Sequence, residues 1–282
     1  MRLRKERKDE KLRLAEKNKV RMHRNVLLNS LKDTLLIIKS HKLAVILLCL
    51  FQLAVIFGFF VTSYAFINPI VEREKEIDPY LSNLRLDETS VGENILGRKN
   101  ILGEDPLLIS RNTRIMSEHF MSYLISLFFL LVLSTAISWS VSINMMKRVA
   151  LSDFARIFMR ILLMSSIFYG LVFSLLYFIG PYLFLVIISI VLLYFFLISL
   201  SLCSSEIKTI PKKTLNIGFK KARYILLVHL INGALLSIFL TALIFFVDRV
   251  LIMILSVLLI SLGMIFSRNF LAKTIEELSS SQ

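Results

Sequence analysis

Residues 161–205 read ILLMSSIFYGLVFSLLYFIGPYLFLVIISIVLLYFFLISLSLCSS, a run of 45 residues without a single Asp, Glu, Lys or Arg. A helix of that length would extend for about 68 Å, whereas the hydrocarbon core of a bilayer is only about 30 Å thick. The run is therefore long enough for two crossings. Gly180-Pro181 near its middle is a dipeptide typical of turns, so we predict two transmembrane helices joined there.

Four more uncharged runs flank this stretch. All 34 basic and 20 acidic side chains lie outside the five runs, 56% of the residues are hydrophobic, and the mean hydropathy is +0.72. An ionised side chain is costly in hydrocarbon, and a helical span needs about 20 apolar residues. We therefore predict an all-α polytopic transmembrane helical bundle, with six spans as three hairpins and basic amphipathic helices on the cytoplasmic side. The further runs cover residues 43–71, 119–146, 224–247 and 250–267. We predict that Asn68-Pro69 ends the first span and that Asp248-Arg249 forms the turn between the fifth and sixth spans.

Basic residues are concentrated in alternate connections between the spans. Lys and Arg outnumber Asp and Glu by 14 to 5 in residues 1–42, by 4 to 1 in 147–160 and by 6 to 1 in 204–223. Residues 68–118, on the other side, hold 7 basic residues against 10 acidic ones. Because cytoplasmic loops carry an excess of Lys and Arg, we predict a multi-pass protein of the cytoplasmic membrane with both termini in the cytoplasm.

This topology divides the chain into four parts. A basic cytoplasmic tail with an interfacial helix occupies residues 1–42, and the first hairpin occupies residues 43–146 with an extracytoplasmic loop at 68–118. Residues 147–267 form a four-helix part made of two related hairpins, and residues 268–282 form a cytoplasmic tail. The relation between the two hairpins is a shift of 63 residues, which superposes Arg160 on Arg223, Gly170 on Gly233 and Ser174 on Ser237.

Small residues recur at every fourth position within the spans. Lipid tails provide no hydrophobic drive between helices, so close backbone approach at small residues supplies the attraction that assembles a membrane bundle. We therefore predict that Gly170→Leu or Gly233→Leu impairs folding or assembly. The candidate helix-packing residues are Gly58, Gly170, Ser174, Gly233 and Ser237.

Three stretches on the cytoplasmic side combine basic with apolar residues. Residues 26–38 and 151–161 place apolar side chains on one helical face, which is typical of helices that lie on the inner leaflet, and cations dominate residues 213–223. The basic residues can hold anionic lipid head groups. Alternatively, residues 147–160 and 204–223 dock a cytosolic partner such as an ATPase. The candidate contact residues are Lys147, Arg148, Arg156, Arg160, Lys212, Lys213, Lys220, Lys221 and Arg223.

Little in the sequence indicates catalysis or a cofactor. His23, His41, His119 and His229 have no metal-ligand spacing, and no Gly-rich phosphate loop, nucleophile elbow or pair of intramembrane carboxylates occurs. We therefore expect no enzyme activity, no metal and no cofactor. No Phe, Tyr or Trp precedes Phe51, so nucleic-acid bases would have nothing to stack on there and specific nucleic-acid binding is not expected.

Gln52 and His229 are two of the polar residues within the uncharged runs. Gln52 in the first span is predicted to form a hydrogen bond between helices. His229 begins the second turn of the fifth span, and we interpret it as a neutral imidazole that reaches water at the inner interface.

These observations favour a non-catalytic scaffold, assembly factor or accessory subunit whose partners are anionic inner-leaflet lipids and a membrane or cytosolic protein. The alternative is the membrane subunit of a permease or transporter coupled to a cytosolic ATPase, which six spans also fit. A lipid-modifying enzyme fits least, because such an enzyme needs acids, bases or metal ligands at the interface and the candidates there are basic groups without partners.

Overall fold

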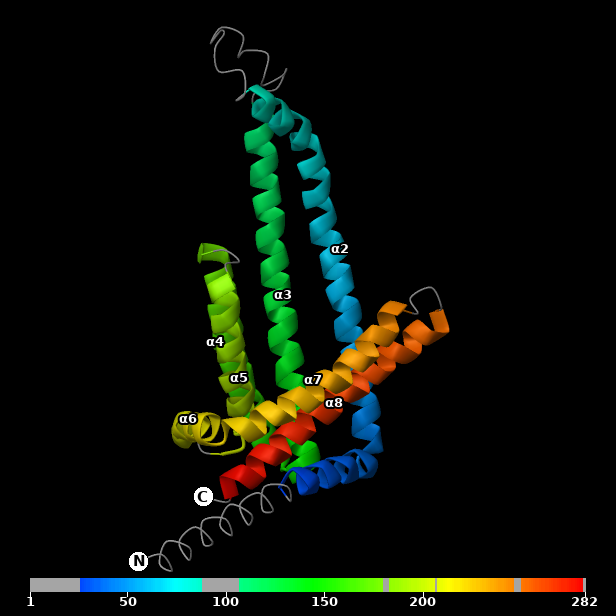
Figure 1. The fold of residues 1–282 in the computed structure, drawn as a ribbon, viewed down its shortest axis with the longest axis vertical. Helices are drawn as coiled ribbons and strands as arrows, with labels where there is room; N and C mark the ends of the chain where they lie inside the picture. Colours follow the sequence, from blue (N-terminus) through cyan, green and yellow to red (C-terminus); the bar gives the residue numbers. More distant parts are fainter. Residues whose placement is uncertain (1–25, 88–106, 180–182, 206, 246–249, 281–282) are drawn as a thin grey trace, which may run out of the picture. The chain divides into compact units, whose positions relative to one another are not determined.

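The computed structural model describes residues 26–87, 107–179, 183–205, 207–245 and 250–280, which are almost entirely helical and contain no strand (Figure 1). Six of the described helices are long and apolar enough to cross a membrane. This confirms the all-α fold with six candidate membrane spans. A helix over residues 26–40 is followed by α2 (Lys42–Asp87), α3 (Leu108–Lys147), α4 (Leu151–Ile179), α5 (Leu183–Ser201), a 3₁₀ turn (Ile207–Thr209), α6 (Ile210–Lys220), α7 (Ala222–Phe245) and α8 (Val250–Ser280).

The chain forms two compact units, and the division passes through α2 and α3. Unit 1 consists of Met1–Leu53 and Val132–Gln282, and unit 2 consists of Ala54–Leu131. All the basic residues predicted to contact lipid or a partner therefore belong to unit 1.

Unit 2 is an antiparallel pair of helical segments from α2 and α3. The predicted end of the first span at Asn68-Pro69 is wrong, because α2 continues through Pro69 and Pro79 to Asp87. A proline inside a helix removes one backbone hydrogen bond and costs about 3 kcal/mol. The surrounding residues offset this cost, since Arg, Lys and Glu are good helix formers and the two helices contact each other beyond Pro69.

These contacts join the charged parts of the two helices. Glu76 of α2 accepts hydrogen bonds from Arg73 Nη1, at 3.0 Å to Oε1 and 2.9 Å to Oε2, and from Asn112 Nδ2 of α3 at 2.8 Å. Ile77 is buried beside them. The expected extracytoplasmic loop is thus helical at both of its described ends, and residues 88–106 lie outside the described part of the chain.

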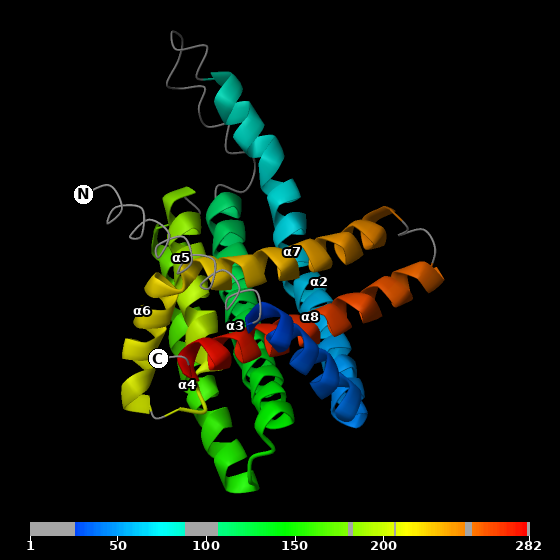
Figure 2. The same ribbon diagram turned by 60° about the horizontal axis from the view of Figure 1, so that its bottom comes forward.

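Unit 1 contains two helical hairpins, α4–α5 and α7–α8. Figures 1 and 2 show α7 and α8 side by side along their length, oblique to α4 and α5. The predicted turns at Gly180-Pro181 and Asp248-Arg249 lie outside the described residues, between helices that end and begin where those turns require. The short α6 packs against α5, where Tyr194 Oη donates to the Gly218 carbonyl at 2.8 Å.

The core of unit 1 lies toward one end of its helices. At this end, which we call the basic end, residues 26–41, 147–150, 202–221 and 270–280 come together. The rings of Phe168 and Phe196 stack at 4.1 Å on the membrane side of this core. Helices α3 to α8 each contribute large buried side chains to it, including Trp139, Ile143, Ile161, Ile198, Ile217, Ile225, Phe270 and Ile275.

Two predicted boundaries at the basic end differ from the structure. Residues 151–161 are not a separate interfacial helix but the first turns of α4, which is continuous to Ile179. The sixth span does not stop at Ser267, because α8 continues to Ser280 and its candidate span covers Ile254–Ser279. By contrast, residues 26–40 and α6 form short helices where interfacial segments were predicted.

Candidate lipid-contact surface and a buried arginine

Exposed cations and exposed apolar side chains lie next to each other on α6. Its inner face is buried through Ile210, Thr214, Ile217 and Gly218, and an added Cβ at Gly218 would lie only 2.5 Å from Phe195 Cε1. Its outer face carries Leu215 (52% exposed) and Phe219 (71% exposed) beside Lys212 and Lys220, which are also exposed. Lys213 and Lys221 are half-buried.

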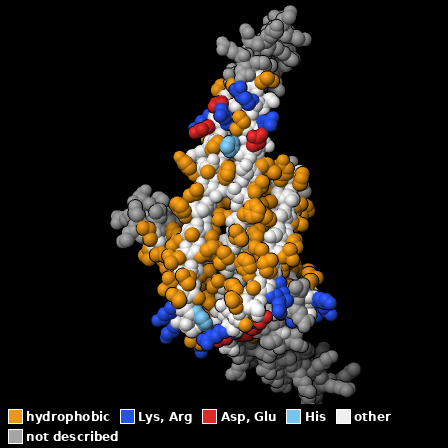
Figure 3. Space-filling view, turned by 180° about the vertical axis from the view of Figure 1, so that it is seen from behind, with side chains coloured by type: hydrophobic (Ala, Val, Ile, Leu, Met, Phe, Trp, Pro, Cys, Tyr) orange, Lys and Arg blue, Asp and Glu red, His pale blue; other side chains and the backbone are white. Residues whose placement is uncertain are grey.

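The same combination occurs where α4 begins. Leu151 is 83% exposed, and Arg156 is exposed with a 3.6 Å ion pair to Asp153 on the helix surface. At the start of α7, Arg223 Nη2 donates to Tyr224 Oη at 2.7 Å and its guanidinium lies 4.9 Å from the centre of the same ring. Lys and Arg side chains gather around the basic end, below the hydrophobic surface of the spans (Figure 3). This arrangement suits the boundary between lipid head groups and acyl chains.

Arg160 contacts the interior of the chain instead. Its Nη1 donates to the carbonyls of Cys203 at 3.3 Å and Ser205 at 2.9 Å, in the turn that follows α5. Carbonyls at a helix C-terminus lack partners within the helix, so Arg160 satisfies groups that would otherwise be unpaired. Burial also raises the pKa of the neighbouring Cys203 thiol to about 12. That thiol therefore stays protonated and unreactive at neutral pH.

Lys147 is likewise engaged within the chain. Its Nζ lies 3.3 Å from Glu276 Oε1 of α8 and donates to Ser204 Oγ at 2.9 Å. Lys273 pairs with the same Glu276 at 3.1 Å and lies 3.8 Å from Asp33 in the helix over residues 26–40. This network joins the first helix, the end of α3, the turn after α5 and the end of α8.

The five residues predicted to pack helices together differ in how closely they contact a neighbouring helix. An added Cβ at Gly58 would be in ordinary contact with Leu130 at 3.4 Å, and Gly170 is half-buried. Gly233 is exposed and no heavy atom lies within 4 Å of its added Cβ, so no described helix packs on it. Ser174 and Ser237 are exposed as well. A tighter contact between α7 and α8 is found at Gly263, where an added Cβ would lie 2.9 Å from Leu235 Cδ2 and 3.1 Å from Leu236 Cδ2.

A cation that the sequence analysis placed outside the spans is half-buried among them. Arg268 lies within α8 and faces Gln52 of α2, which is ten residues, or about 15 Å, beyond the start of that helix. The hydrogen-bond network orients the Gln52 amide. Its oxygen accepts from Arg268 Nη1 at 3.0 Å and from Nη2, and its nitrogen donates to the Ser261 carbonyl at 2.9 Å. The Nε of Arg268 is buried without a hydrogen-bond partner among the described residues.

This cluster confirms the prediction that Gln52 bonds between helices. Arg268 itself was missed because it directly follows the uncharged run 250–267, whose end was interpreted as the end of the span. His229 is half-buried and its Nε2 has no partner in the described part of the chain. Nearby, Asn232 Nδ2 donates to the Ser267 carbonyl at 3.3 Å, which joins α7 to α8.

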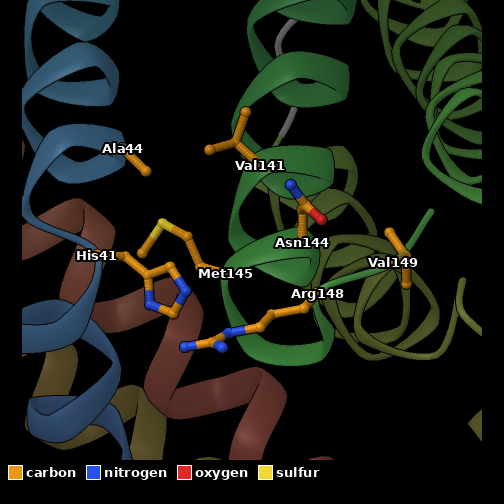
Figure 4. A pocket seen from close by; sticks show the side chains of 7 residues that line it. All are labelled: His41, Ala44, Val141, Asn144, Met145, Arg148 and Val149. Carbon is orange, nitrogen blue, oxygen red and sulfur yellow. The ribbon is translucent and has the colours of Figure 1, made fainter. Parts of the chain in front are cut away.

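A cavity of about 310 Å³ lies at the basic end between the start of α2 and the end of α3 (Figure 4). Figure 4 shows the Arg148 side chain extending from the end of α3 toward the imidazole of His41. Nothing in the sequence pattern joined these two residues, which lie more than a hundred positions apart. The remaining lining residues are Ala44, Val141, Asn144, Met145 and Val149.

Within the described residues, no group of three His, Cys, Asp or Glu side chains could hold a metal ion. Comparison with protein-family models, with curated proteins and with solved structures found no match for this chain. The chain is an integral membrane protein by its six apolar helices. The features that bear on its specific role are the basic end and the exposed surfaces of the spans.

Proposed function

We propose that the protein is a non-catalytic scaffold, assembly factor or accessory subunit of a prokaryotic cytoplasmic membrane. Both termini lie in the cytoplasm and the basic end lies on anionic lipid of the inner leaflet. The observation that carries this proposal is the outer face of α6, where Lys212 and Lys220 are exposed beside Leu215 and Phe219. Cations beside apolar side chains fit a surface that contacts head groups and acyl chains together.

The spans themselves supply a second argument, for a protein partner. Only 11% of the most apolar stretch of α4 is buried within the chain. Leu163, Ile167 and Phe178 of this helix are each at least 63% exposed. Because unit 1 is packed mainly at its basic end, such surfaces are free to contact lipid or the helices of another membrane protein. An assembly or accessory role uses surfaces of this kind.

Affinity purification of the full chain from its native membrane in mild detergent tests the proposal. We expect a membrane protein to copurify at a fixed ratio, and we expect proteoliposomes that contain the purified chain alone to move no solute. Preferential binding to vesicles with anionic lipid over purely zwitterionic vesicles is expected from the basic end, at about fivefold for each productive cation.

The competing function is a permease subunit that engages a cytosolic ATPase through α6. Leu215 and Phe219 would then fill a pocket on the ATPase rather than contact acyl chains. Copurification of an ATPase whose hydrolysis rate rises on reconstitution with this chain, together with solute uptake driven by ATP, would establish that function in place of the scaffold.

A further inference from the structure

The cavity at the basic end has one polar and one apolar side. Arg148, His41 and Asn144 form the polar part, and the apolar part is formed by Ala44 and Met145 together with two valines. Its volume of about 310 Å³ is at the lower end of ligand pockets in proteins, roughly 300 Å³. A ligand that matches both sides must be an amphiphile.

Arg148 has an unusual backbone conformation at this position. Its φ of 46° is in the left-handed region, where the residue after a helix is usually glycine. Its N–H donates to the Asn144 carbonyl at 2.8 Å and so closes α3. Any residue could make that backbone bond, and glycine would make it without strain. The use of arginine here therefore points to a role for the side chain.

The charge of Arg148 is available to a ligand. Among the described residues its guanidinium contacts no carboxylate, whereas the neighbouring Lys147 is paired with Glu276. Glu276 is in addition shared with Lys273. The imidazole of His41 is held by Ser40 Oγ at 2.8 Å, so it lies fixed opposite the guanidinium (Figure 4). A cation that has no carboxylate partner in the described part of the chain attracts an anionic group into this cavity.

The apolar side of the cavity leads toward lipid. Met145 belongs to a buried cluster with Val45, Leu48 and Ile265. On α2, Leu43 (73% exposed) and Leu47 (57% exposed) project outside this cluster. An acyl chain could follow these side chains away from the cavity, whereas a soluble phosphate compound would leave them unused.

We propose that this cavity binds one anionic phospholipid, with its phosphate on Arg148 and its acyl chains along the apolar side of the cavity. The inference rests on the proposed function, because it assigns a specific site to the general lipid contact of the basic end. It differs from that contact in predicting a stoichiometry of one and a dependence on one residue.

Native mass spectrometry of the full-length protein in detergent tests the site by titration with phosphatidylglycerol. Phosphatidylcholine with the same acyl chains is the zwitterionic control. We expect the wild type to retain one phosphatidylglycerol and Arg148→Gln to bind it about five- to tenfold more weakly. Arg156→Gln removes a cation of the general lipid contact but none of the cavity lining, so we expect it to weaken vesicle binding while the affinity for the single retained lipid stays within about twofold. Ala44→Leu keeps every charge but fills the apolar side of the cavity, so we expect it to lower lipid occupancy as Arg148→Gln does. If Arg148→Gln does not fold, Ala44→Leu by itself tests the site.

Four results would overturn the site, and the last of them would also overturn the proposed lipid contact. Equal weakening by Arg148→Gln and Arg156→Gln would leave only the general contact of the basic end. Displacement of the lipid by soluble glycerol phosphate at comparable concentration would make the ligand a free phosphate compound. Full occupancy in Ala44→Leu would place the lipid elsewhere. If neither variant nor wild type distinguished phosphatidylglycerol from phosphatidylcholine, the proposed lipid contact would fail together with the site.

Discussion

Arg268 carries a positive charge in a half-buried position within α8, where few groups are available to replace its hydration. It lies beside Gln52, about 15 Å along α2 from the start of that helix, and its Nε is buried without a hydrogen-bond partner among the described residues. The amide oxygen of Gln52 replaces part of the lost hydration. A buried charged donor deprived of its acceptor costs more than the hydrogen bond was worth, so these two side chains should be strongly coupled.

Gln52→Leu is therefore expected to destabilise the protein by about 1.5–3 kcal/mol, because hydrogen bonds to charged groups have roughly that value. Arg268→Leu combined with Gln52→Leu replaces both partners by apolar groups, and we expect the double variant to recover most of the loss. The thermal midpoint in mild detergent, read from the far-ultraviolet circular dichroism, is the measurement. Additive losses in the double variant would show that the two side chains do not depend on each other.

Arg160 and Arg156 offer a matched comparison on one helix. We expect Arg160→Gln to lower stability by about 1.5–3 kcal/mol, because the carbonyls of Cys203 and Ser205 lose a charged donor. Arg156→Gln removes only an exposed pair with Asp153, which is worth about 0–1 kcal/mol. Detergent-solubilised yield and thermal midpoint of the two variants measure this difference. Equal effects would mean that the turn after α5 does not depend on Arg160.

For single residues, the sequence predicted what a side chain does better than which residue it contacts. Gln52 was correctly expected to bond between helices, because an amide in hydrocarbon must find a partner. Its partner could not be predicted, since no periodicity relates residues so far apart. Arg160 was grouped with the surface cations because its sequence neighbourhood resembles theirs, and only the position of the carbonyls after α5 separates it from them.

Among the helices, the contact of α7 with α8 depends on one glycine. An added Cβ at Gly263 would lie 2.9 and 3.1 Å from two leucine methyl groups of α7, so a larger side chain requires those leucines to move. We expect Gly263→Leu to cost about 1–3 kcal/mol by overpacking, and Gly233→Leu, on the open side of α7, to be neutral. Thermal stability of the two variants tests this. A loss in Gly233→Leu alone would instead reveal a partner helix on that surface.

The elements also show where sequence reasoning about helix ends fails. Desolvation of charges is a large, local energy, so the uncharged runs identified all six spans. Helix ends depend on smaller, non-local terms. Pro69 was interpreted as a stop, but the contact of Glu76 with Asn112 supports the helix beyond it. The end of α8 extends past Ser267 because Lys273 and Glu276 find partners on other helices.

For the molecule as a whole, the packing of unit 1 mainly at its basic end separates two kinds of surface. The basic end is internally cross-linked by ion pairs and a continuous core. The remainder of α4 and α5 is apolar and exposed, as at Phe178 and Phe184. The ion pairs and the core of unit 1 are thus concentrated at one end, whereas apolar surface is exposed along the rest of α4 and α5. Such apolar surfaces suit contact with lipid or with the helices of another membrane protein, as the proposed accessory role requires.

The proposed orientation can be tested by labelling in intact cells. Because Cys49 and Cys203 are both buried in the folded chain, single cysteines introduced by Gln282→Cys and Glu93→Cys provide the reactive thiols. The excess of cations at the basic end predicts that it faces the cytoplasm. A membrane-impermeant maleimide should then label Glu93→Cys in intact cells and label Gln282→Cys only after permeabilisation.

The reverse pattern would place the basic end outside and remove the proposed contact with the inner leaflet, while the six spans would remain. Labelling of both positions in intact cells would place them on the same side of the membrane. An even number of helices would then cross between them, whereas the six-span topology has five candidate spans there.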